Sequence, residues 1–492
     1  MIDHDRVVRG KGAFIILFIM FFSLGVRIYF LAHTDNCLGV IPTQKIFFSL
    51  RLPQDSFAEL FRAQHLYRYL LKGWITLWAA TDVPCRALSL IFGFVSLLPF
   101  YLAVKIITDE LTALIATFLL GIDPWHIILS TLSMEEAPFY FFIFCALYYF
   151  FNYTFKGYKK KCLFLSAALI AVSCGFRIDG FMYPFILTAL LLRKARKKEA
   201  LIFFALSFSW PLLTMIASWL YEHNPFSPFV LQSRYASLEL AHSNQNIFSV
   251  GKSILTLSPF FFSVFGFIGL VRCLGDGKMR IVNSIFFVFL LCFLIKIISN
   301  SLFFQPRYLL SFGLFFLIYI AVGFIFAIRR LKNTKIQLLC ILVFFVSSFL
   351  LSARYLRENE KQFVLSPEIK NIISFVSRLK DEERLLLDID QHHRYAETIV
   401  VNSGVDSCLK ITTLPEVELN GQILLSDFSR AMYRASLIRE LSNKEFDYIL
   451  YCPDGRSMRW LVPMRSEQER IGIASYKRMV LGKDYWIYKV EK

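Results

Sequence analysis

Charged residues stand at the ends of several long apolar stretches in this sequence. Asp35 follows the first stretch, Glu135 and Glu136 precede a later one, and Arg177 and Asp179 interrupt another within CGFRIDG. Further arginines in comparable places are Arg27, Arg86 and Arg307. Because an ionisable group within or beside a membrane-spanning segment is costly, each of these residues is a candidate functional residue.

Asp35 is the strongest candidate for a catalytic residue. A carboxylate in a loop is ionised near neutral pH, so it could act as a general base that takes a proton from an incoming hydroxyl or amine. The alternative is that Asp35 caps the next turn beside Asn36. A loss of activity on replacing Asp35 would separate the two.

The arginines suggest a bound phosphate. A guanidinium group keeps its charge and offers a fork of donors that matches phosphate oxygens, so Arg27, Arg86, Arg177 and Arg307 are candidate ligands of a phosphate or diphosphate. In the alternative, Arg27 snorkels to the headgroups, Arg86 and Arg307 are interfacial anchors, and Arg177 pairs with Asp179.

The two glutamates lie just before a helix. Glu135 and Glu136 are more easily explained as caps for its free N–H groups, but one of them could orient an acceptor or a metal.

The amino-acid composition indicates that these charged residues belong to a membrane protein. The chain has 492 residues, of which 56% are hydrophobic and only 18% charged, which predicts an α-helical polytopic membrane protein. The net charge of +17 comes from short basic segments between apolar stretches, since the part from Arg354 onward is about neutral. That is the positive-inside pattern, and it argues against nucleic acid as a partner.

Placing the basic segments in the cytoplasm predicts about eleven transmembrane helices with the N-terminus inside. The expected helices are Gly12–Ala32, Arg86–Ile107, Leu111–Asp123, Glu136–Phe155, Cys162–Phe176, Ile178–Leu192, Ala200–Tyr221, Ile247–Val271, Ile281–Phe304, Arg307–Ala327 and Ile336–Arg354. The external side then holds loop 33–85, the segment Pro124–Glu135 as a loop, and everything after the last helix.

The expected organisation is a transmembrane domain over 1–355 and a separate domain over 356–492. ERLLLDI and FDYILYC are short apolar runs typical of strands. DFSRAMYRASLIREL, between them, has apolar residues at helical spacing. Together they predict a C-terminal external α/β domain. Within loop 33–85, Ser56–Ala79 has apolar residues at helical spacing and is expected at the membrane interface or packed on other loops. The ten cysteines lack zinc-ligand spacing.

These features resemble the GT-C superfamily of membrane glycosyltransferases, in particular family 39, with protein O-mannosyltransferases and the lipid A aminoarabinose transferase. The resemblance rests on six segments together with the FDYILY strand: Arg27–Asp35, His65–Trp74, CRALSLIFG, SMEEAPF, GFRIDG and QPRYLL. It covers the membrane part well and the C-terminal part loosely.

The resemblance implies transfer of a sugar from a polyprenyl-phosphate donor to a cell-envelope acceptor on the external face, usually with inversion. Asp35 would be the catalytic carboxylate, and Arg177 and Arg307 would lie near the donor phosphate. Tyr67 and Tyr308, which lie in matching motifs, would join Glu135, Glu136 and Asp179 as acceptor-binding or supporting residues. The setting would be a bacterial inner membrane; no cofactor is established, with a divalent cation left open.

Two departures from the family pattern and two other functions stay open. Asn36 stands where the family commonly has Glu, and Arg68 stands where it often has tyrosine. The first alternative is a transporter or flippase of lipid-linked saccharides, which would need a polar path through the bilayer and ideally inverted repeats. The second is a non-catalytic scaffold whose external domain binds a partner. Lipid-linked sugar crossing the membrane uncleaved would favour the first, and donor binding without transfer would favour the second.

Overall fold

The computed structural model describes residues 4–35, 66–78, 82–157, 159–194, 196–230, 260–298, 310–365 and 367–378, together with short strand segments between 385 and 491. These residues divide into two compact units. Of the described residues, the helical unit contains 4–34, 66–71 and Arg86–Lys361, and the second unit contains Asp35, the segment Lys72–Cys85 and those of Gln362–Lys492.

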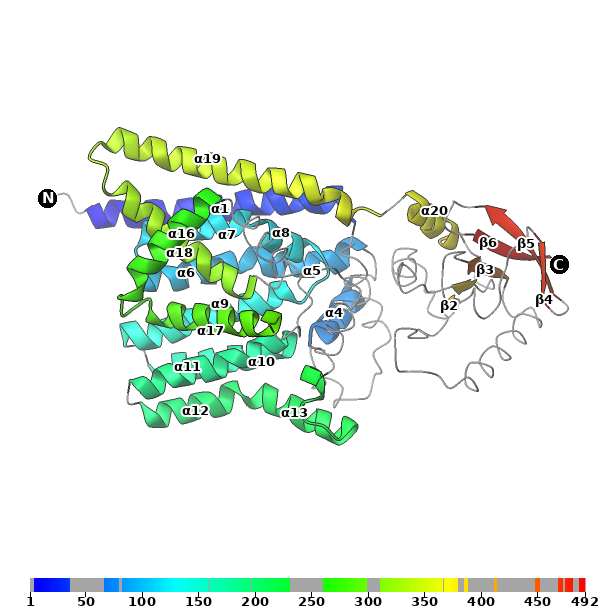
Figure 1. Cartoon of the computed structure of the whole chain (residues 1–492), viewed down its shortest axis with the longest axis horizontal. Helices are drawn as coiled ribbons and strands as arrows, with labels where there is room; N and C mark the ends of the chain where they lie inside the picture. Colours follow the sequence, from blue (N-terminus) through cyan, green and yellow to red (C-terminus); the bar gives the residue numbers. More distant parts are fainter. Residues whose placement is uncertain are drawn as a thin grey trace. The chain divides into compact units, whose positions relative to one another are not determined.

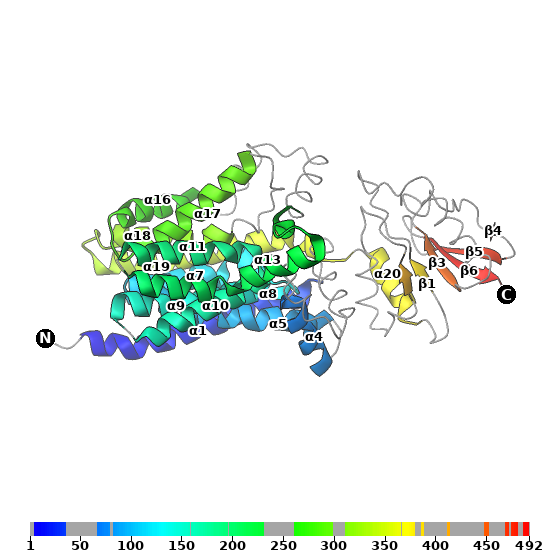
Figure 2. The ribbon, with the colours of Figure 1, turned by 90° about the horizontal axis from the view of Figure 1, so that it is seen from below.

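The helical unit is a bundle in which helices far apart in sequence lie side by side (Figure 1). Its helices are α1 (His4–His33), α4 (Leu66–Leu77, whose last turns belong to the second unit), α5 (Asp82–Val95), α6 (Leu97–Ile107), α7 (Glu110–Ile122), α8 (Pro124–Thr131), α9 (Glu136–Lys156), α10 (Lys160–Phe176), the 3-10 turn η1 (Ile178–Phe181), α11 (Met182–Arg193), α12 (Lys197–Ser207), α13 (Ser209–Glu222), α16 (Phe260–Leu274), α17 (Arg280–Ile298), α18 (Leu310–Ile328) and α19 (Thr334–Asn359). Helix α7 is central, because it packs against α1 on one side and α18 on the other (Figure 2).

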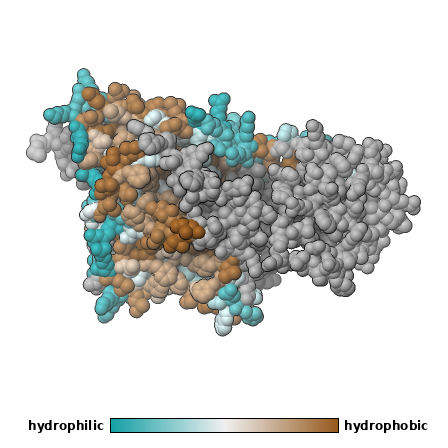
Figure 3. All heavy atoms as spheres, viewed as in Figure 1, coloured by the Kyte–Doolittle hydropathy of each residue, from teal (hydrophilic) through white to brown (hydrophobic). Residues whose placement is uncertain are grey.

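The outward surface of this unit is apolar, which indicates an integral membrane protein. Side chains of α19 such as Leu338, Leu342 and Leu350 are about 60% exposed, a state that water disfavours and lipid accommodates. Figure 3 shows apolar residues across much of the visible helical surface and hydrophilic residues along one end. In the part of the chain that the structure describes, four helices are long and apolar enough to span a membrane, or up to six if bent helix pairs each count once.

The described parts of the expected helices are helical, but two of these helices are broken and one expected loop is not a loop. Arg86–Ile107 forms α5 and α6, and Ala200–Tyr221 forms α12 and α13 with a bend of 46°. Pro124–Glu135 was predicted to be a loop, but Pro124–Thr131 forms α8, which follows α7 after a bend of 55° at Asp123. Asp123 caps α8 by accepting the backbone N–H of His126 at 2.7 Å, and Pro124 occupies the first turn. The interruption therefore breaks one apolar segment into two helices. The stretch 247–259 lies outside the described residues.

The basic turns lie together at one end of the bundle. The turns between α9 and α10, α11 and α12, α16 and α17, and α18 and α19 share that end in Figure 1. A salt bridge joins two of the elements there, since Arg329 Nη2 after α18 lies 2.9 Å from Asp109 Oδ2, the cap of α7. The predicted clustering of basic segments on one side is thus present in the fold.

Helices α16 and α18 approach each other at their backbones. A Cβ atom placed on Gly269 would lie 1.9 Å from the carbonyl oxygen of Tyr319, and one placed on Gly323 would lie 2.0 Å from that of Phe265. Glycine at both positions lets the helices cross at this distance, as small residues do between membrane helices.

The second unit contains a mixed sheet of six strands in the order β2-β1-β3-β6-β5-β4. The strands are β1 (Leu385–Leu387), β2 (Ile411–Thr413), β3 (Tyr448–Tyr451), β4 (Gln468–Ile471), β5 (Ala474–Val480) and β6 (Trp486–Glu491), and helix α20 (Pro367–Val376) precedes them. β1 pairs in parallel with β2 and β3, whereas β6 pairs antiparallel with β3 and β5. Phe375 of α20 packs edge-on against Tyr448 of β3, so the helix contacts the sheet.

Candidate functional site

The short segment between α8 and α9 is fixed by hydrogen bonds to α5 and α4. The backbone N–H of Met134 donates to Ser89 Oγ at 3.2 Å, and that hydroxyl donates to the Met134 carbonyl at 2.9 Å. Tyr67 Oη, on α4, lies 2.9 Å from the same Ser89 Oγ. Tyr67 is fully buried, so here the tyrosine supports the segment that leads into Glu136.

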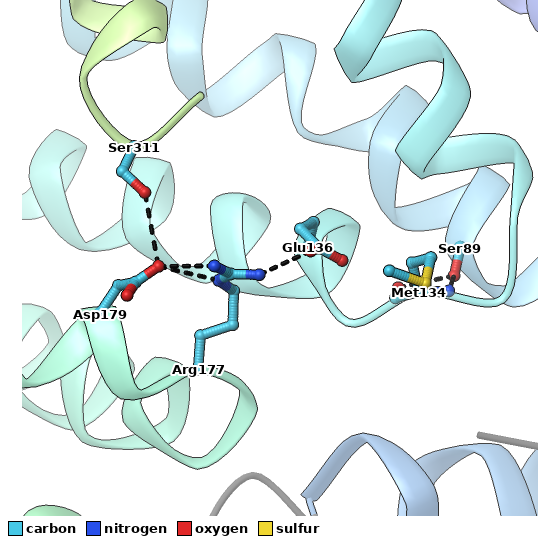
Figure 4. Close-up of polar contacts among 6 residues, drawn as sticks. All are labelled: Ser89, Met134, Glu136, Arg177, Asp179 and Ser311. Atoms are coloured by element: carbon cyan, nitrogen blue, oxygen red, sulfur yellow. Dashed lines mark hydrogen bonds and ion pairs between the residues drawn. The ribbon is translucent and has the colours of Figure 1, made fainter. Parts of the chain in front are cut away.

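Glu136 belongs to a buried charged cluster built from three parts of the chain (Figure 4). Arg177, between α10 and η1, donates from Nη1 to Glu136 Oε1 and from Nη2 to Asp179 Oδ2, each at 2.6 Å. Ser311 Oγ, in the first turn of α18, lies 3.4 Å from the same Asp179 oxygen. Arg177 and Asp179 pair, as the alternative reading of the sequence held, and Glu136 joins them from 41 positions away.

Arg177 stays charged in this setting. Burial alone would lower its pKa, but the facing carboxylates of Asp179 and Glu136 raise the pKa well above its ordinary value. Arg177 is thus contacted by carboxylates from two segments of the chain. A phosphate at Arg177 would compete with these carboxylates for the donors of the guanidinium group.

Arg27 is enclosed by protein oxygens. Its side chain is fully buried in the middle of the bundle. The guanidinium group donates to Ser130 Oγ at 2.9 Å and to the carbonyl of Gly121 at 2.9 Å, contacts Ser23, and lies 2.6 Å from His126 Nδ1. These contacts join α1 to α7 and α8, which is a structural role.

Arg86 is held in the same manner. Its Nε donates to the carbonyl of Thr131 at 2.6 Å, and its Nη1 donates to the carbonyl of Thr34 at 2.6 Å. The side chain is 1% exposed. Arg86 thus ties the ends of α1 and α8 to α5, and a phosphate-binding role for Arg27 or Arg86 stays a prediction.

Asp35 is positioned by the chain that follows α19. Its backbone N–H donates to the carbonyl of Phe363 at 2.8 Å, and its Oδ2 accepts the backbone N–H of Leu365 at 2.7 Å. Lys370 Nζ, on α20, lies 3.0 Å from the same oxygen. The Asp35 side chain is 30% exposed, so the carboxylate is oriented and also accessible to solvent.

Several predicted residues are buried or lie outside the described part. Glu135 is 5% exposed at the start of α9, where its side chain makes no capping hydrogen bond to the helix. Arg307, Tyr308 and Asn36 lie outside the described residues.

A metal site is not evident in the described parts of the chain. They contain no group of three or more histidine, cysteine, aspartate or glutamate side chains that could hold a metal ion. The carboxylates of Glu136 and Asp179 face Arg177 instead.

Sequence reasoning missed three residues that complete these sites. Ser311 and Lys370 contact Asp179 and Asp35 from segments far along the chain, and nothing in their local sequence signals it. Asp123 could have been found, because an Asp-Pro pair inside an apolar stretch predicts a helix start.

The fold is that of known polytopic membrane proteins. The structure is similar to that of ArnT from Cupriavidus metallidurans, with a TM-score of 0.64 for the apo state at 11% identity, covering 96% of this chain and 97% of that chain. The form bound to undecaprenyl phosphate gives a TM-score of 0.63.

A second similar structure is the oligosaccharyltransferase AglB from Archaeoglobus fulgidus. Its complex with an inhibitory peptide and a dolichol-phosphate gives a TM-score of 0.54 at 12% identity, covering 92% of this chain and 70% of that chain. The same archaeal protein has been solved with Zn and sulfate.

The sequence comparisons agree with the fold. The family model described as dolichyl-phosphate-mannose-protein mannosyltransferase matches residues 59–196. A comparison with curated protein sequences gives no significant match. The chain therefore has the GT-C fold of membrane glycosyltransferases, which confirms the resemblance noted in its sequence.

Proposed function

We propose that this protein is an integral-membrane glycosyltransferase that moves a sugar from a polyprenyl-phosphate donor to a cell-envelope acceptor. One observation carries the proposal: the matched segment 59–196 supplies Glu136, Arg177 and Asp179, the buried ionic cluster of the helical unit. Buried charges in a membrane protein mark functional sites by default. ArnT with undecaprenyl phosphate and AglB with a dolichol-phosphate have the same fold and bind lipid phosphates of this class.

Asp35 would act as the general base. Its Oδ2 is held by Leu365 and Lys370, which fixes the orientation of the carboxylate. In the reaction, the carboxylate takes the proton of the acceptor hydroxyl or amine, and the acceptor atom forms a bond to the anomeric carbon of the sugar. The bond from that carbon to the phosphate oxygen breaks, and polyprenyl phosphate leaves.

The arginines would bind the phosphate of the donor. Arg177 is the described arginine best suited to this role, because carboxylate and phosphate oxygens are alternative partners of the same guanidinium fork. Arg307 would contribute with it, with Tyr308 and Glu135 beside the acceptor. The isoprenoid chain lies in the lipid, since each buried CH₂ contributes about 0.8 kcal/mol.

We infer the orientation from the basic turns. With about eleven crossings and these turns in the cytoplasm, residues 356–492 would lie outside as an α/β domain. A bacterial inner membrane is the setting we propose. The described residues do not fit a divalent cation, so no step of the reaction is routed through one.

Replacing Asp35 with Asn tests the proposal. Transfer from polyprenyl-phosphate sugars to envelope extracts is measured with the full-length protein in proteoliposomes. Loss of a general base lowers the rate by about 100-fold or more. The melting temperature should fall only slightly, because Asn can still accept the Leu365 N–H and the lost salt bridge to Lys370 is partly exposed. Wild-type activity in Asp35→Asn would refute the assignment. Passage of intact lipid-linked sugar across the bilayer without cleavage would instead identify a transporter.

A further inference from the structure

A cavity opens at the end of the bundle that carries the basic turns. It has a volume of about 830 Å³ and lies between the α6–α7 turn, the α16–α17 turn and the last turns of α18. Its lining combines apolar side chains, including Val322 and Ile325, with the charged side chains of Arg272, Lys278 and Arg329. This cavity plays no part in the proposed transfer reaction.

Among the described residues, the cations of the cavity outnumber its anions. Arg329 pairs with Asp109, and no salt bridge with Arg272 or Lys278 is formed in the described part. Asp276, which also lines the cavity, accepts the backbone N–H of Lys278 at 2.7 Å and so caps the turn. With three basic and two acidic side chains, the lining carries a net charge of about +1.

Arg272 is held in place by an aromatic ring. Its Cζ lies 4.4 Å from the ring centroid of Phe326, and the Cζ of Arg330 lies 4.5 Å from the same centroid. Stacking of this kind orients the guanidinium group while its N–H donors stay available to a ligand.

Apolar side chains form part of the cavity wall. Ile107, Val322, Ile325 and Phe326 line it beside the cations. A ligand that places an anionic group among the cations could lay a hydrocarbon chain along these residues. A phospholipid has both parts.

We propose that this cavity binds the phosphate headgroup of an anionic phospholipid from the leaflet at the basic end of the bundle. The site is separate from Arg177, because α10 runs from Lys160 at the basic end to Phe176 beside Arg177, a length of about 25 Å. Its occupant would stabilise the crossing of α16 and α18, whose backbones touch at Gly269 and Gly323. A free phosphate ion shares the headgroup chemistry and is the other source to test.

The test uses the full-length protein in detergent micelles, titrated with phosphatidylglycerol or phosphatidylcholine and observed by native mass spectrometry. The wild type should bind one phosphatidylglycerol in preference to phosphatidylcholine. Arg272→Gln with Lys278→Gln should bind it about thirtyfold more weakly, since each basic residue near a lipid surface contributes about a factor of five. Phosphatidylglycerol should also raise the melting temperature of the wild type and leave that of this variant unchanged.

The matched control removes two lysines from the same end outside the cavity. Lys160→Gln with Lys161→Gln changes the net charge equally, and both lysines are exposed at the start of α10. The control should keep wild-type lipid binding. Equal loss in both double variants would overturn the proposal, because general surface charge would then explain the binding.

Two further measurements distinguish a bound lipid from a soluble anion and cover the case in which the double variant does not fold. If inorganic phosphate displaces phosphatidylglycerol and alone raises the melting temperature, the ligand is a soluble anion and the lipid assignment is wrong. If the double variant does not fold, Arg272→Lys replaces it, because this variant keeps the charge and loses the stacking on Phe326. Unchanged lipid affinity in Arg272→Lys would count against the site, and weaker binding would support it.

Discussion

Arg177 Nη1 lies 2.6 Å from Glu136 Oε1, and this buried ion pair joins two residues that are 41 positions apart in the sequence. The guanidinium group also contacts Asp179, so two carboxylates share one cation. Removing the cation leaves two buried anions facing each other.

Replacing Arg177 with Met should therefore destabilise the fold. Loss of one partner from a buried ion pair costs about 3–5 kcal/mol. Glu136→Gln should cost less, because the amide oxygen still accepts a hydrogen bond. Thermal unfolding in detergent measures both, and a wild-type melting temperature in Arg177→Met would show that the ion pairs do not stabilise the bundle.

The same Glu136→Gln change should strengthen binding of the carrier lipid. A phosphate competes with the carboxylates for Arg177, and the neutral amide competes less well. We expect undecaprenyl phosphate to bind about 3-fold to 10-fold more tightly, by a gain of roughly 1 kcal/mol. Weaker binding would mean that Glu136 contacts the lipid directly.

The variant Arg27→Met tests whether Arg27 has a structural role or binds the donor phosphate. The side chain is fully buried and donates to Ser130 Oγ and the Gly121 carbonyl, so its loss leaves buried acceptors unsatisfied at a cost of about 1–3 kcal/mol each. The variant should melt at a lower temperature, whereas Arg354→Gln, whose side chain is 73% exposed, should melt like the wild type. An unaltered melting temperature with weaker donor binding would assign Arg27 to the phosphate after all.

Gly323→Ala tests the crossing of α16 and α18. The new Cβ would lie 2.0 Å from the carbonyl oxygen of Phe265, so the helices must separate, at a cost of about 1–3 kcal/mol. Gly313→Ala on the same helix is the control, because nothing lies within 4 Å of its Cβ position. Equal melting temperatures for the two variants would contradict the close approach.

The helices of the bundle were largely predictable, because each apolar stretch carries its own signal. The sidedness of the basic turns was also predictable, since charge density is local to each turn. Helix α8 was missed because its apolar residues continue those of α7, and the Asp-Pro pair that divides them was not used.

The polar contacts were predictable only where the two partners are close together in the sequence. Arg177 and Asp179 are two positions apart, and their pairing was anticipated. The partners of Arg27 and Arg86 are mostly hydroxyl groups and backbone carbonyls on other helices, which leave no trace in sequence composition. Sequence reasoning therefore found charged positions and could not tell a ligand-binding arginine from one that joins helices.

The hydrogen bond between Asp35 and Leu365 has a consequence for biosynthesis, because it spans 330 positions. While the ribosome is still making the intervening chain, the residues that orient this carboxylate do not yet exist. Phe363, Leu365 and Lys370 are translated only after α19. The carboxylate therefore acquires its defined geometry only after residue 370 has been translated, and a chain that ends before this point would display the first helix without an organised base.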